Sequence, residues 1–250
     1  MNANKAVDSN PEAANTVGPF TVYAAGGLFT QDELTTNVLI KEAVWRLSNG
    51  KFQLFLPQSM ELQGPDKPDA EANIRNIDLL AVVSSDIVLA RFDGLELDAG
   101  TVIEFAVAKS LGKPTVILRC DFRRLHSTGQ DDPYNLMAKN WPRTVSIHFD
   151  SLVIWAGLLA SERQAPGSSQ SFEATMKAEL GLIQKSIDKI ALQVITAMEE
   201  AMQMKSPFPP EYQEMVYKAA RFSPGSGFDE LLTERELGEI IQRLRKNGTL

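Results

Sequence analysis

Short apolar runs alternate with helical patterns along residues 20–149, and this alternation constrains the fold more than any other feature of the sequence. The runs are rich in β-branched and aromatic side chains, which is typical of β-strands. The third run is almost continuously apolar, as expected of a central strand in a parallel sheet. The predicted strands are Phe20–Ala25, Phe52–Pro57, Asp86–Phe92, Pro114–Cys120 and Thr144–Phe149.

Helical patterns fill the segments between these runs. Thr30 and Glu33 form a T-x-x-E capping box that predicts a helix start, and Asn49-Gly50 predicts its end. Further helices are expected at Ala70–Val83 and Gly100–Leu111. Repeated strand–helix–strand units at this spacing imply right-handed crossovers. We therefore expect an α/β fold with a doubly wound five-stranded parallel sheet, similar to flavodoxin or Rossmann domains.

The character of the chain changes after residue 161. Residues 162–171 have the composition of a linker, and residues 172–204 repeat apolar side chains at steps of three and four, which predicts one long helix. We expect its apolar stripe to pack on the main domain or on a partner subunit. Two shorter helices are predicted to follow, the last opened by a second capping box at Thr233 and Glu236. The predicted organisation is a mobile tail (1–18), a catalytic domain (19–161), the linker (162–171) and an all-helical extension (172–250).

Composition excludes several classes of function. A formal net charge of −7 argues against a nucleic-acid polymer as partner, because phosphate binding requires a basic surface. The single cysteine, Cys120, excludes an intramolecular disulfide framework and a cysteine-based zinc site. No apolar run approaches the length of a membrane span, and residues 1–18 do not resemble a secretory signal. We expect a cytoplasmic protein without a membrane partner.

Polar and glycine residues follow the predicted strands at the edge where ligands bind in doubly wound sheets. The first strand ends in "AAGG", the second in "PQSM", the third in "FDGLELD" and the fourth in "CDF". The loop after the third strand and the helix that follows carry Asp93, Glu96, Asp98 and Glu104 within a dozen residues. Such a crowd of carboxylates is a poor way to stabilise a fold and a plausible way to build a site.

Two of the acidic residues stand among apolar neighbours. Glu104 lies within "VIEFAV", and Asp78 lies on or beside the buried face of its helix, where an unpaired charge is costly. Asp98 is also suited to a purely structural role as the N-cap of the following helix. There is no phosphate-binding loop of the G-x-x-x-x-G-K-[ST] type and no G-x-G-x-x-G fingerprint, and His126 and His148 are isolated. Without metal or cofactor motifs, paired carboxylates favour acid/base or nucleophilic chemistry on an acetal-like bond.

The segments "VYAAGGLFT", "IDLLAVVSSDIVLARFDGLELDAGTVIEFAVAKSLGKP" and "YNLM", in this order, resemble the nucleoside 2-deoxyribosyltransferases over about residues 20–159. The resemblance implies exchange of the base of a 2-deoxyribonucleoside through a covalent glycosyl-enzyme, without a cofactor or metal. Glu104 matches the family's nucleophile, Asp98 the acid that binds and protonates the base, and Asp78 an acid that orders the sugar. Tyr23 matches the tyrosine that orients the nucleophile.

The resemblance also implies a substrate site shared between chains. Asn135 and Met137 match residues that reach the site of a neighbouring subunit, so a homo-oligomer is expected, based on dimers and extending to a hexamer in some arrangements. Without the resemblance, "YNLM" would be interpreted as a surface loop. The remaining candidates for substrate binding are Gly26, Gly27, Phe29 and Gln58.

The chain departs from the family in two places, and two alternatives stay open. Leu28 follows the glycine turn where some members carry tryptophan, and the chain continues for about 90 residues beyond the last predicted strand. The first alternative is an N-glycoside hydrolase of 2-deoxynucleosides or their 5′-monophosphates. The absence of arginine from "AAGGLFT" favours unphosphorylated nucleosides. The second alternative is a nucleotide-sensing module without catalytic activity.

Overall fold

The computed structural model describes residues 18–59, 69–94, 96–121, 135–163 and 171–250. The predicted N-terminal tail lies outside these residues except for Gly18, and so do most of the predicted linker and His126. The fold described below therefore rests on the five predicted strands, the helices between them and the helical extension.

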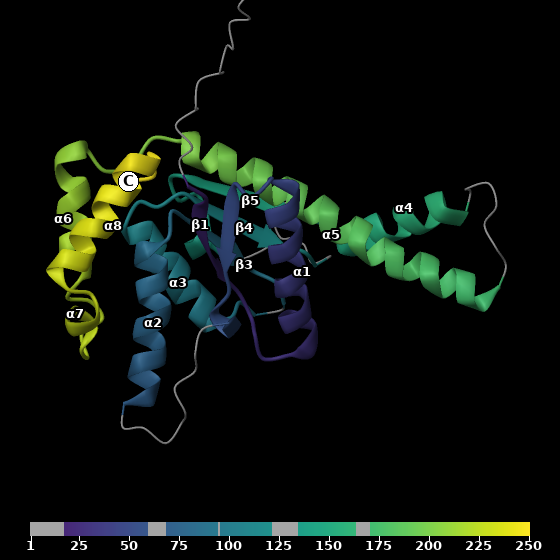
Figure 1. The fold of residues 1–250 in the computed structure, drawn as a ribbon, viewed down its shortest axis with the longest axis horizontal. Coiled ribbons are helices and arrows are strands. Elements are labelled where there is room, and N and C mark those ends of the chain that lie inside the picture. The colour runs from purple at the N-terminus through teal and green to yellow at the C-terminus, as the bar shows by residue number, and fades with distance from the viewer. Residues whose placement is uncertain (1–17, 60–68, 95, 122–134, 164–170) are drawn as a thin grey trace, which may run out of the picture.

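The sheet has five strands, all parallel, in the order β2-β1-β3-β4-β5 (Figure 1). This is the flavodoxin-like order, so the predicted fold class is confirmed. Each strand lies within a predicted run, and the central strands β3 and β4 are buried at every position. The bounds are β1 (Phe20–Ala25), β2 (Phe52–Phe55), β3 (Ile87–Arg91), β4 (Thr115–Arg119) and β5 (Thr144–His148).

Side chains cap the starts of two of the helices that lie between the strands. α1 (Gln31–Leu47) opens with the predicted capping box of Thr30 and Glu33. α2 spans Ala70–Ser84, and α3 spans Ala99–Ser110, with Asp98 as its N-cap. The N-cap assignment confirms that Asp98 has a structural role, whatever else its carboxylate does.

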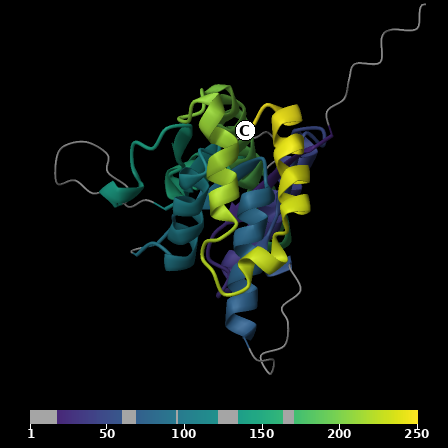
Figure 2. The same ribbon diagram turned by 90° about the vertical axis from the view of Figure 1, so that its left-hand side faces the viewer.

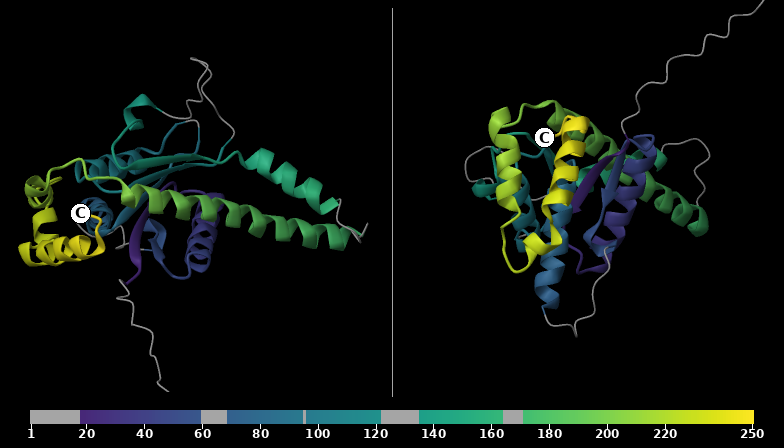
Figure 3. Two further views of the ribbon diagram at one scale, coloured as in Figure 1. Left: turned by 90° about the horizontal axis from the view of Figure 1, so that it is seen from above. Right: turned by 60° about the vertical axis from the view of Figure 1, so that its left-hand side comes forward.

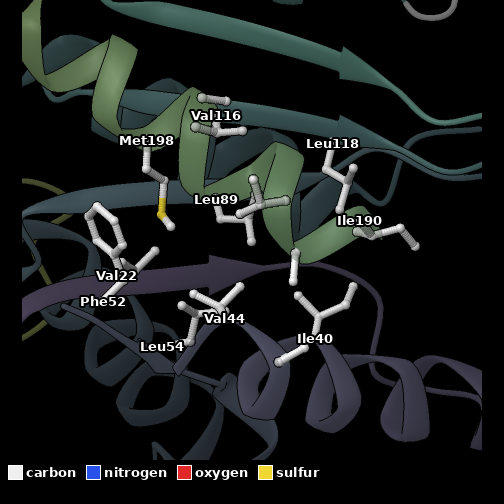
Figure 4. Close-up of a cluster of buried hydrophobic side chains, with 14 of the residues drawn as sticks. Val22, Ile40, Val44, Phe52, Leu54, Leu89, Val116, Leu118, Ile190 and Met198 are labelled. Carbon is white, nitrogen blue, oxygen red and sulfur yellow. The ribbon is translucent and has the colours of Figure 1, made fainter. Parts of the chain in front are cut away.

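The sheet is covered on both faces. α1 and the long helix α5 (Phe172–Gln203) lie on one face, where their apolar side chains meet alternate residues of the strands in the largest buried cluster (Figure 4). α2 and α3 cover the other face, where Val82 and Ala108 pack against Tyr23 and Val88. Because α5 supplies half of one covering layer, its second half is part of the same core as the strands.

Three helices follow α5 and pack beside α2 (Figure 2). They are α6 (Pro210–Ala220), the single turn α7 (Phe228–Leu231) and α8 (Glu234–Asn247), where two helices were predicted. α8 begins with the predicted capping box at Thr233 and Glu236 and ends at Gly248. Tyr217, Phe228 and Leu244 are buried in one cluster with Leu79 and Val83 of α2. The helical extension is therefore in close contact with the sheet domain.

α4 (Ser151–Arg163) was not predicted. It leaves the end of β5 and packs antiparallel to the first part of α5, and together they extend past the sheet as an arm (Figures 1 and 3). The predicted packing of the apolar stripe of α5 is confirmed for residues 187–202, which lie on the sheet, but residues 172–183 expose theirs. None of the described helices combines the length and apolar character needed to cross a membrane.

Candidate active site

The sheet reverses its winding direction between β1 and β3, which are neighbours. The chain leaves β1 for α1 on one face and leaves β3 for α3 on the other. In doubly wound sheets ligands bind at such a point, in the crevice outside the carboxyl ends of the strands. The loop Gly26–Thr30 lies on one side of this crevice. The loop after β3 and the start of α3 lie on the other.

Tyr23 and Glu104 meet below this crevice. The hydroxyl of Tyr23, on β1, donates a hydrogen bond of 2.6 Å to Oε1 of Glu104, on α3. Tyr23 is completely buried by α2 and α3, and Glu104 is half-buried one turn into α3. The strand therefore holds the tyrosine rigidly, and the tyrosine fixes one oxygen of the carboxyl group.

Burial disfavours the charge of Glu104. It raises the pKa of this carboxyl to about 7; the hydrogen bond from Tyr23 lowers it, and the charges of Asp78 and Asp98 raise it. Burial and the charge of Glu104 also raise the pKa of Tyr23 well above its ordinary value, so the tyrosine remains a donor. A carboxyl group poised near neutrality and held by a single donor is suited to act as a nucleophile.

Asp78 belongs to the same group of side chains. It projects from the middle of α2, and burial raises its pKa to about 6. Its charge raises the pKa values of both Tyr23 and Glu104, so it acts electrostatically on the same pair. The structure therefore brings together the four predicted catalytic residues: Tyr23, Asp78, Asp98 and Glu104.

Asp98 uses one oxygen to start α3. Its Oδ2 accepts hydrogen bonds of 2.7 Å from both the amide and the hydroxyl of Thr101. Glu96, two residues earlier, is exposed. The two acidic residues of this loop thus differ, since only Asp98 is held in a fixed position next to Glu104.

A chain of hydrogen bonds joins the ends of three strands on the opposite side of the crevice. The amide of Asn37, on α1, donates to the carbonyl of Gly27 at 3.1 Å and to Oε1 of Gln58 at 2.8 Å. Its Oδ1 accepts from Arg91 at 2.8 Å. Asn37 thus ties the loops after β1 and β2 to the last residue of β3. Gln58 also donates to the carbonyl of Leu34, which fixes the orientation of its side-chain amide.

Asp93 and Asp121 extend this chain to β4. Asp93 accepts a hydrogen bond of 2.6 Å from the amide of Cys120 and forms an ion pair with Arg91. Asp121 accepts from the amide of Gly94 and from Arg119. These two carboxylates hold the loop after β3 in place. Asp93 therefore has a structural role, whereas Asp98 and Glu104 belong to the candidate site.

Of the remaining predicted binding residues, Phe29, Asn135 and Met137 are exposed, whereas Gly26 is partly buried. Gly26 packs closely against Arg91, since a Cβ at Gly26 would lie 3.3 Å from the Cβ of Arg91. Phe29 is 80% exposed and Met137 is 81% exposed. The side chain of Asn135 accepts a hydrogen bond from the amide of Met137 and caps a short 3-10 turn. The side chains of Asn135 and Met137 are accessible in the single chain, and their contact with another subunit stays a prediction.

Sequence reasoning missed Asn37 and Arg91. The available signal was an arginine at the end of an otherwise apolar strand, because such a charge must find partners close by. Across the described ranges, no three His, Cys, Asp or Glu side chains are grouped so as to hold a metal ion. His148 contacts the backbone carbonyl of Asp121 at 2.8 Å, away from the Tyr23–Glu104 pair.

Comparisons with known proteins give the following relationships. Residues 22–137, slightly less than half of the chain, match the family described as nucleoside 2-deoxyribosyltransferase, which confirms the resemblance noted in the sequence. A search of the curated proteins found no match. Similar solved structures include a conserved protein from Enterococcus faecalis V583, at 19% identity and a TM-score of 0.43, covering 73% of this chain and 99% of the other. A 2-deoxyribosyltransferase from Bacillus psychrosaccharolyticus has 20% identity and a TM-score of 0.41, covering 52% and 85%. A 2-deoxyribosyltransferase from Leishmania mexicana has 24% identity and a TM-score of 0.40, covering 57% and 98%.

Proposed function

Residues 22–137 carry the pattern of the nucleoside 2-deoxyribosyltransferase family, and from this premise we propose that the chain exchanges the base of 2-deoxyribonucleosides. The observation that supports this most directly is the 2.6 Å hydrogen bond between Tyr23 and Glu104. It presents a half-buried carboxyl group, with its pKa raised to about 7, near the place where doubly wound sheets bind ligands.

In the proposed reaction the ionised carboxylate of Glu104 attacks C1′ of the sugar. A bond forms between its free oxygen and C1′ while the C1′–N bond breaks, and the departing base takes the electron pair of that bond. A second base then attacks C1′ and releases Glu104. Two inversions give net retention, and the scheme requires neither a metal nor a redox cofactor.

The residues around Glu104 are assigned the other roles in the proposed reaction. We assign Asp98 to the base, which it binds and protonates as the base leaves, because it lies at the crevice side of Glu104. Asp78 is assigned to the sugar, since its charge acts on both Glu104 and Tyr23. Tyr23 orients the attacking carboxylate. Gly26, Gly27, Phe29 and Gln58 are proposed to border the substrate on the other side.

We propose that the protein is a homo-oligomer, based on dimers. Asn135 and Met137 lie on an exposed segment, and an exposed methionine is suited to contact a neighbouring chain. In this arrangement Asn135 binds the 5′-hydroxyl of a sugar held mainly by the other subunit. The enzyme is proposed to act in the cytoplasm, which fits the single cysteine.

One observation favours unphosphorylated substrates. The start of a helix offers free amides that commonly bind phosphate. At α1 the carboxylate of Glu33 accepts hydrogen bonds from the amides of Phe29 and Thr30, at 3.0 and 2.9 Å. It also fills the space that a Cβ on Gly27 would need. A negative carboxylate already occupies the position, so a 5′-phosphate would be repelled there.

The test compares base exchange with hydrolysis. Deoxyinosine is incubated with and without adenine, and both deoxyadenosine and hypoxanthine are measured. Transfer predicts that deoxyadenosine forms faster than hypoxanthine accumulates without acceptor. Equal release of hypoxanthine in both reactions would instead establish an N-glycoside hydrolase, and binding without turnover would establish a sensing module.

The Glu104→Ala variant tests the nucleophile, and Glu96→Gln is the matched control, since Glu96 is an exposed acid of the same loop. We expect Glu104→Ala to lose transfer by ~10³-fold or more and the control to keep it. Near-normal exchange by Glu104→Ala would exclude the covalent mechanism.

A further inference from the structure

Thr101 is the first residue on the buried face of α3. Phe105 and Ala108 follow it at four and seven positions along the helix and pack against the strands. Thr101 itself is 1% exposed. Packing alone does not require a hydroxyl at this position, because the side chain of valine has nearly the same shape. A buried hydroxyl needs a hydrogen-bond partner, and the partner of this one indicates what the threonine does.

That partner is the carboxylate of Asp98. Oδ2 of Asp98 accepts both the hydroxyl and the amide of Thr101, each at 2.7 Å. Capping the helix requires only the bond from the amide. A carboxylate oxygen has about two lone-pair sites, and these two donors occupy both sites of Oδ2. Within the described ranges no residue donates to Oδ1, which is therefore the oxygen that can meet a substrate.

Gly100 leaves space for the same oxygen. A Cβ at Gly100 would lie 3.2 Å from Oδ2 of Asp98, which is closer than an ordinary van der Waals contact. The start of α3 is thus shaped around one oxygen of Asp98, since Gly100 leaves the room and Thr101 supplies both donors. The carboxylate cannot rotate without losing two short hydrogen bonds, so the position of Oδ1 is fixed as well.

Thr101 also stands next to Glu104 on the helix. Residues three apart lie on the same side of an α-helix, with about 5–6 Å between their Cβ atoms, and Glu104 follows Thr101 at this spacing. The charge of Asp98 raises the pKa of Glu104, so the two carboxyl groups act on each other. Thr101 therefore fixes an acid within electrostatic reach of the carboxylate that is proposed to attack the sugar.

We propose that Thr101 is a positioning residue that leaves Oδ1 of Asp98 as the atom through which protons pass to and from the base. This inference rests on the proposed function. When the C1′–N bond breaks, its electron pair goes to the base, and the proton on Oδ1 moves to a ring nitrogen of that base. The charge left on Asp98 is stabilised by the two donors at Oδ2. In the second half of the reaction the incoming base returns a proton to Oδ1.

Thr101→Val removes the hydroxyl but keeps the shape of the side chain and the amide that caps α3. We expect kcat/KM for transfer from deoxyguanosine to adenine to fall ~10-fold or more, because a hydrogen bond to a charged group is lost. Thr101→Ser keeps the hydroxyl and should stay within about threefold of the wild type. Thr196→Val is the matched control, since the hydroxyl of Thr196 is exposed and donates to a carbonyl of its own helix. Unchanged transfer by Thr101→Val would overturn the proposal.

The leaving group distinguishes this role from a structural one. The base of 7-methyldeoxyguanosine is already cationic, so it leaves as a neutral molecule without receiving a proton. Release of the base is measured in a single turnover with enzyme in excess, for this donor and for deoxyguanosine. We expect Thr101→Val to slow deoxyguanosine ~10-fold or more and 7-methyldeoxyguanosine by less than about threefold. An equal loss for both donors would show that Thr101 only maintains the shape of the site.

Gly100→Ala tests the space around Oδ2 independently. Its methyl group should displace the carboxylate and slow transfer several-fold, whereas the melting temperature should not fall, because alanine favours a helix more than glycine does. Gly238→Ala is the matched control, since a Cβ at Gly238 would meet nothing within 4 Å. Normal transfer by both Gly100→Ala and Thr101→Val, in a wild type that exchanges bases, would refute only the role of Thr101. A wild type that exchanges no bases would refute the proposed function itself.

Discussion

At the scale of the residue, Glu104 shows the conflict between stability and reactivity. Burial raises its pKa to about 7 from an ordinary value near 4.5. Between these values the folded protein holds the proton more tightly than the unfolded chain, so stability falls as pH rises and is lowest above pH 7. The ionised form that the proposed reaction needs is therefore the form that the fold tolerates least.

This conflict predicts that Glu104→Gln stabilises the protein. The variant has no charge to bury, so at pH 8 we expect its free energy of unfolding to exceed that of the wild type by about 2 kcal/mol. The difference should shrink towards pH 4, where the carboxyl group is protonated in both states. Denaturant unfolding at both pH values measures it, with Glu96→Gln as the control. A variant that is less stable than the wild type at pH 8 would show that burying the charge of Glu104 does not destabilise the fold.

Tyr23 predicts a shift in the pH profile. Its hydrogen bond lowers the pKa of Glu104, so Tyr23→Phe should raise that pKa further. Because the nucleophile must be ionised, kcat/KM falls on the acid side of about pH 7, and this limb should move upward by ~1 pH unit in the variant. Tyr212→Phe, at an exposed tyrosine on α6, is the control. An unmoved limb would mean that a different group controls the rate.

Part of the site could be predicted from the sequence for a physical reason. Glu104 and Asp78 stand among apolar neighbours, and such isolation is visible in one dimension. The role of Asn37 was not visible, because polar residues are ordinary on a helix and its partners are 10, 21 and 54 positions away. Asp93 and Glu96 resembled site residues by proximity alone, and only the structure separates them from Asp98.

At the scale of the element, the loops after β1 and β2 and the end of β3 are held together by Asn37. These loops carry Gly27 and Gln58, which are proposed to border the substrate. Without Asn37 these loops should become mobile. We expect this to weaken substrate binding more than it slows the chemical step, because Glu104 is held independently by Tyr23. Asn37 is therefore a positioning residue for the proposed site.

We expect Asn37→Ala to raise KM for the deoxynucleoside about tenfold while kcat changes by less than about threefold. The acid limb of the pH profile should stay in place, since Asn37 does not contact Glu104. Gln193→Ala, at an exposed amide on α5, should change neither constant. A fall in kcat with an unchanged KM would contradict the positioning role.

At the scale of the whole molecule, the sequence predicted the sheet and most helices because their capping residues and apolar periods are local. It did not predict α4, whose apolar side chains have no polar face to give them a period. It also suggested that residues 172–250 are a separate unit. That division remains a prediction, but the second half of α5 shares its core with Val22 and Leu89 of the sheet.

A buried polar connection between the extension and the sheet is at Asp86, immediately before β3. This completely buried carboxylate accepts hydrogen bonds from the amide and hydroxyl of Thr21 on β1 and from three side chains of the extension. Burial raises its pKa, but these hydrogen bonds and the charge of Arg243 outweigh burial and hold the pKa below its ordinary value. The partners in the extension are Arg243, Asn247 and Thr249, at 2.8, 2.9 and 3.0 Å.

Asp86→Asn should therefore destabilise the entire molecule. It weakens the hydrogen bonds of a buried carboxylate and removes the counter-charge of Arg243, whose side chain is 37% exposed, so the expected loss is ~1.5–3 kcal/mol. The depressed pKa makes the stabilisation present above about pH 4 and lost as pH falls through the folded pKa, so the loss should be constant from pH 6 to 8. Arg245→Ala is the control, because Arg245 pairs with Glu214 at the surface and should cost less than about 1 kcal/mol.

Hydrogen exchange decides whether the extension unfolds with the sheet. If the two are one cooperative unit, the amides of α8 and of β1 should lose the same amount of protection in Asp86→Asn, because the carboxylate connects them directly. Loss of protection in α8 with unchanged protection in β1 would show that the extension opens independently. The sheet would then keep its core without the helices that follow α5, and residue 204 would mark a true boundary.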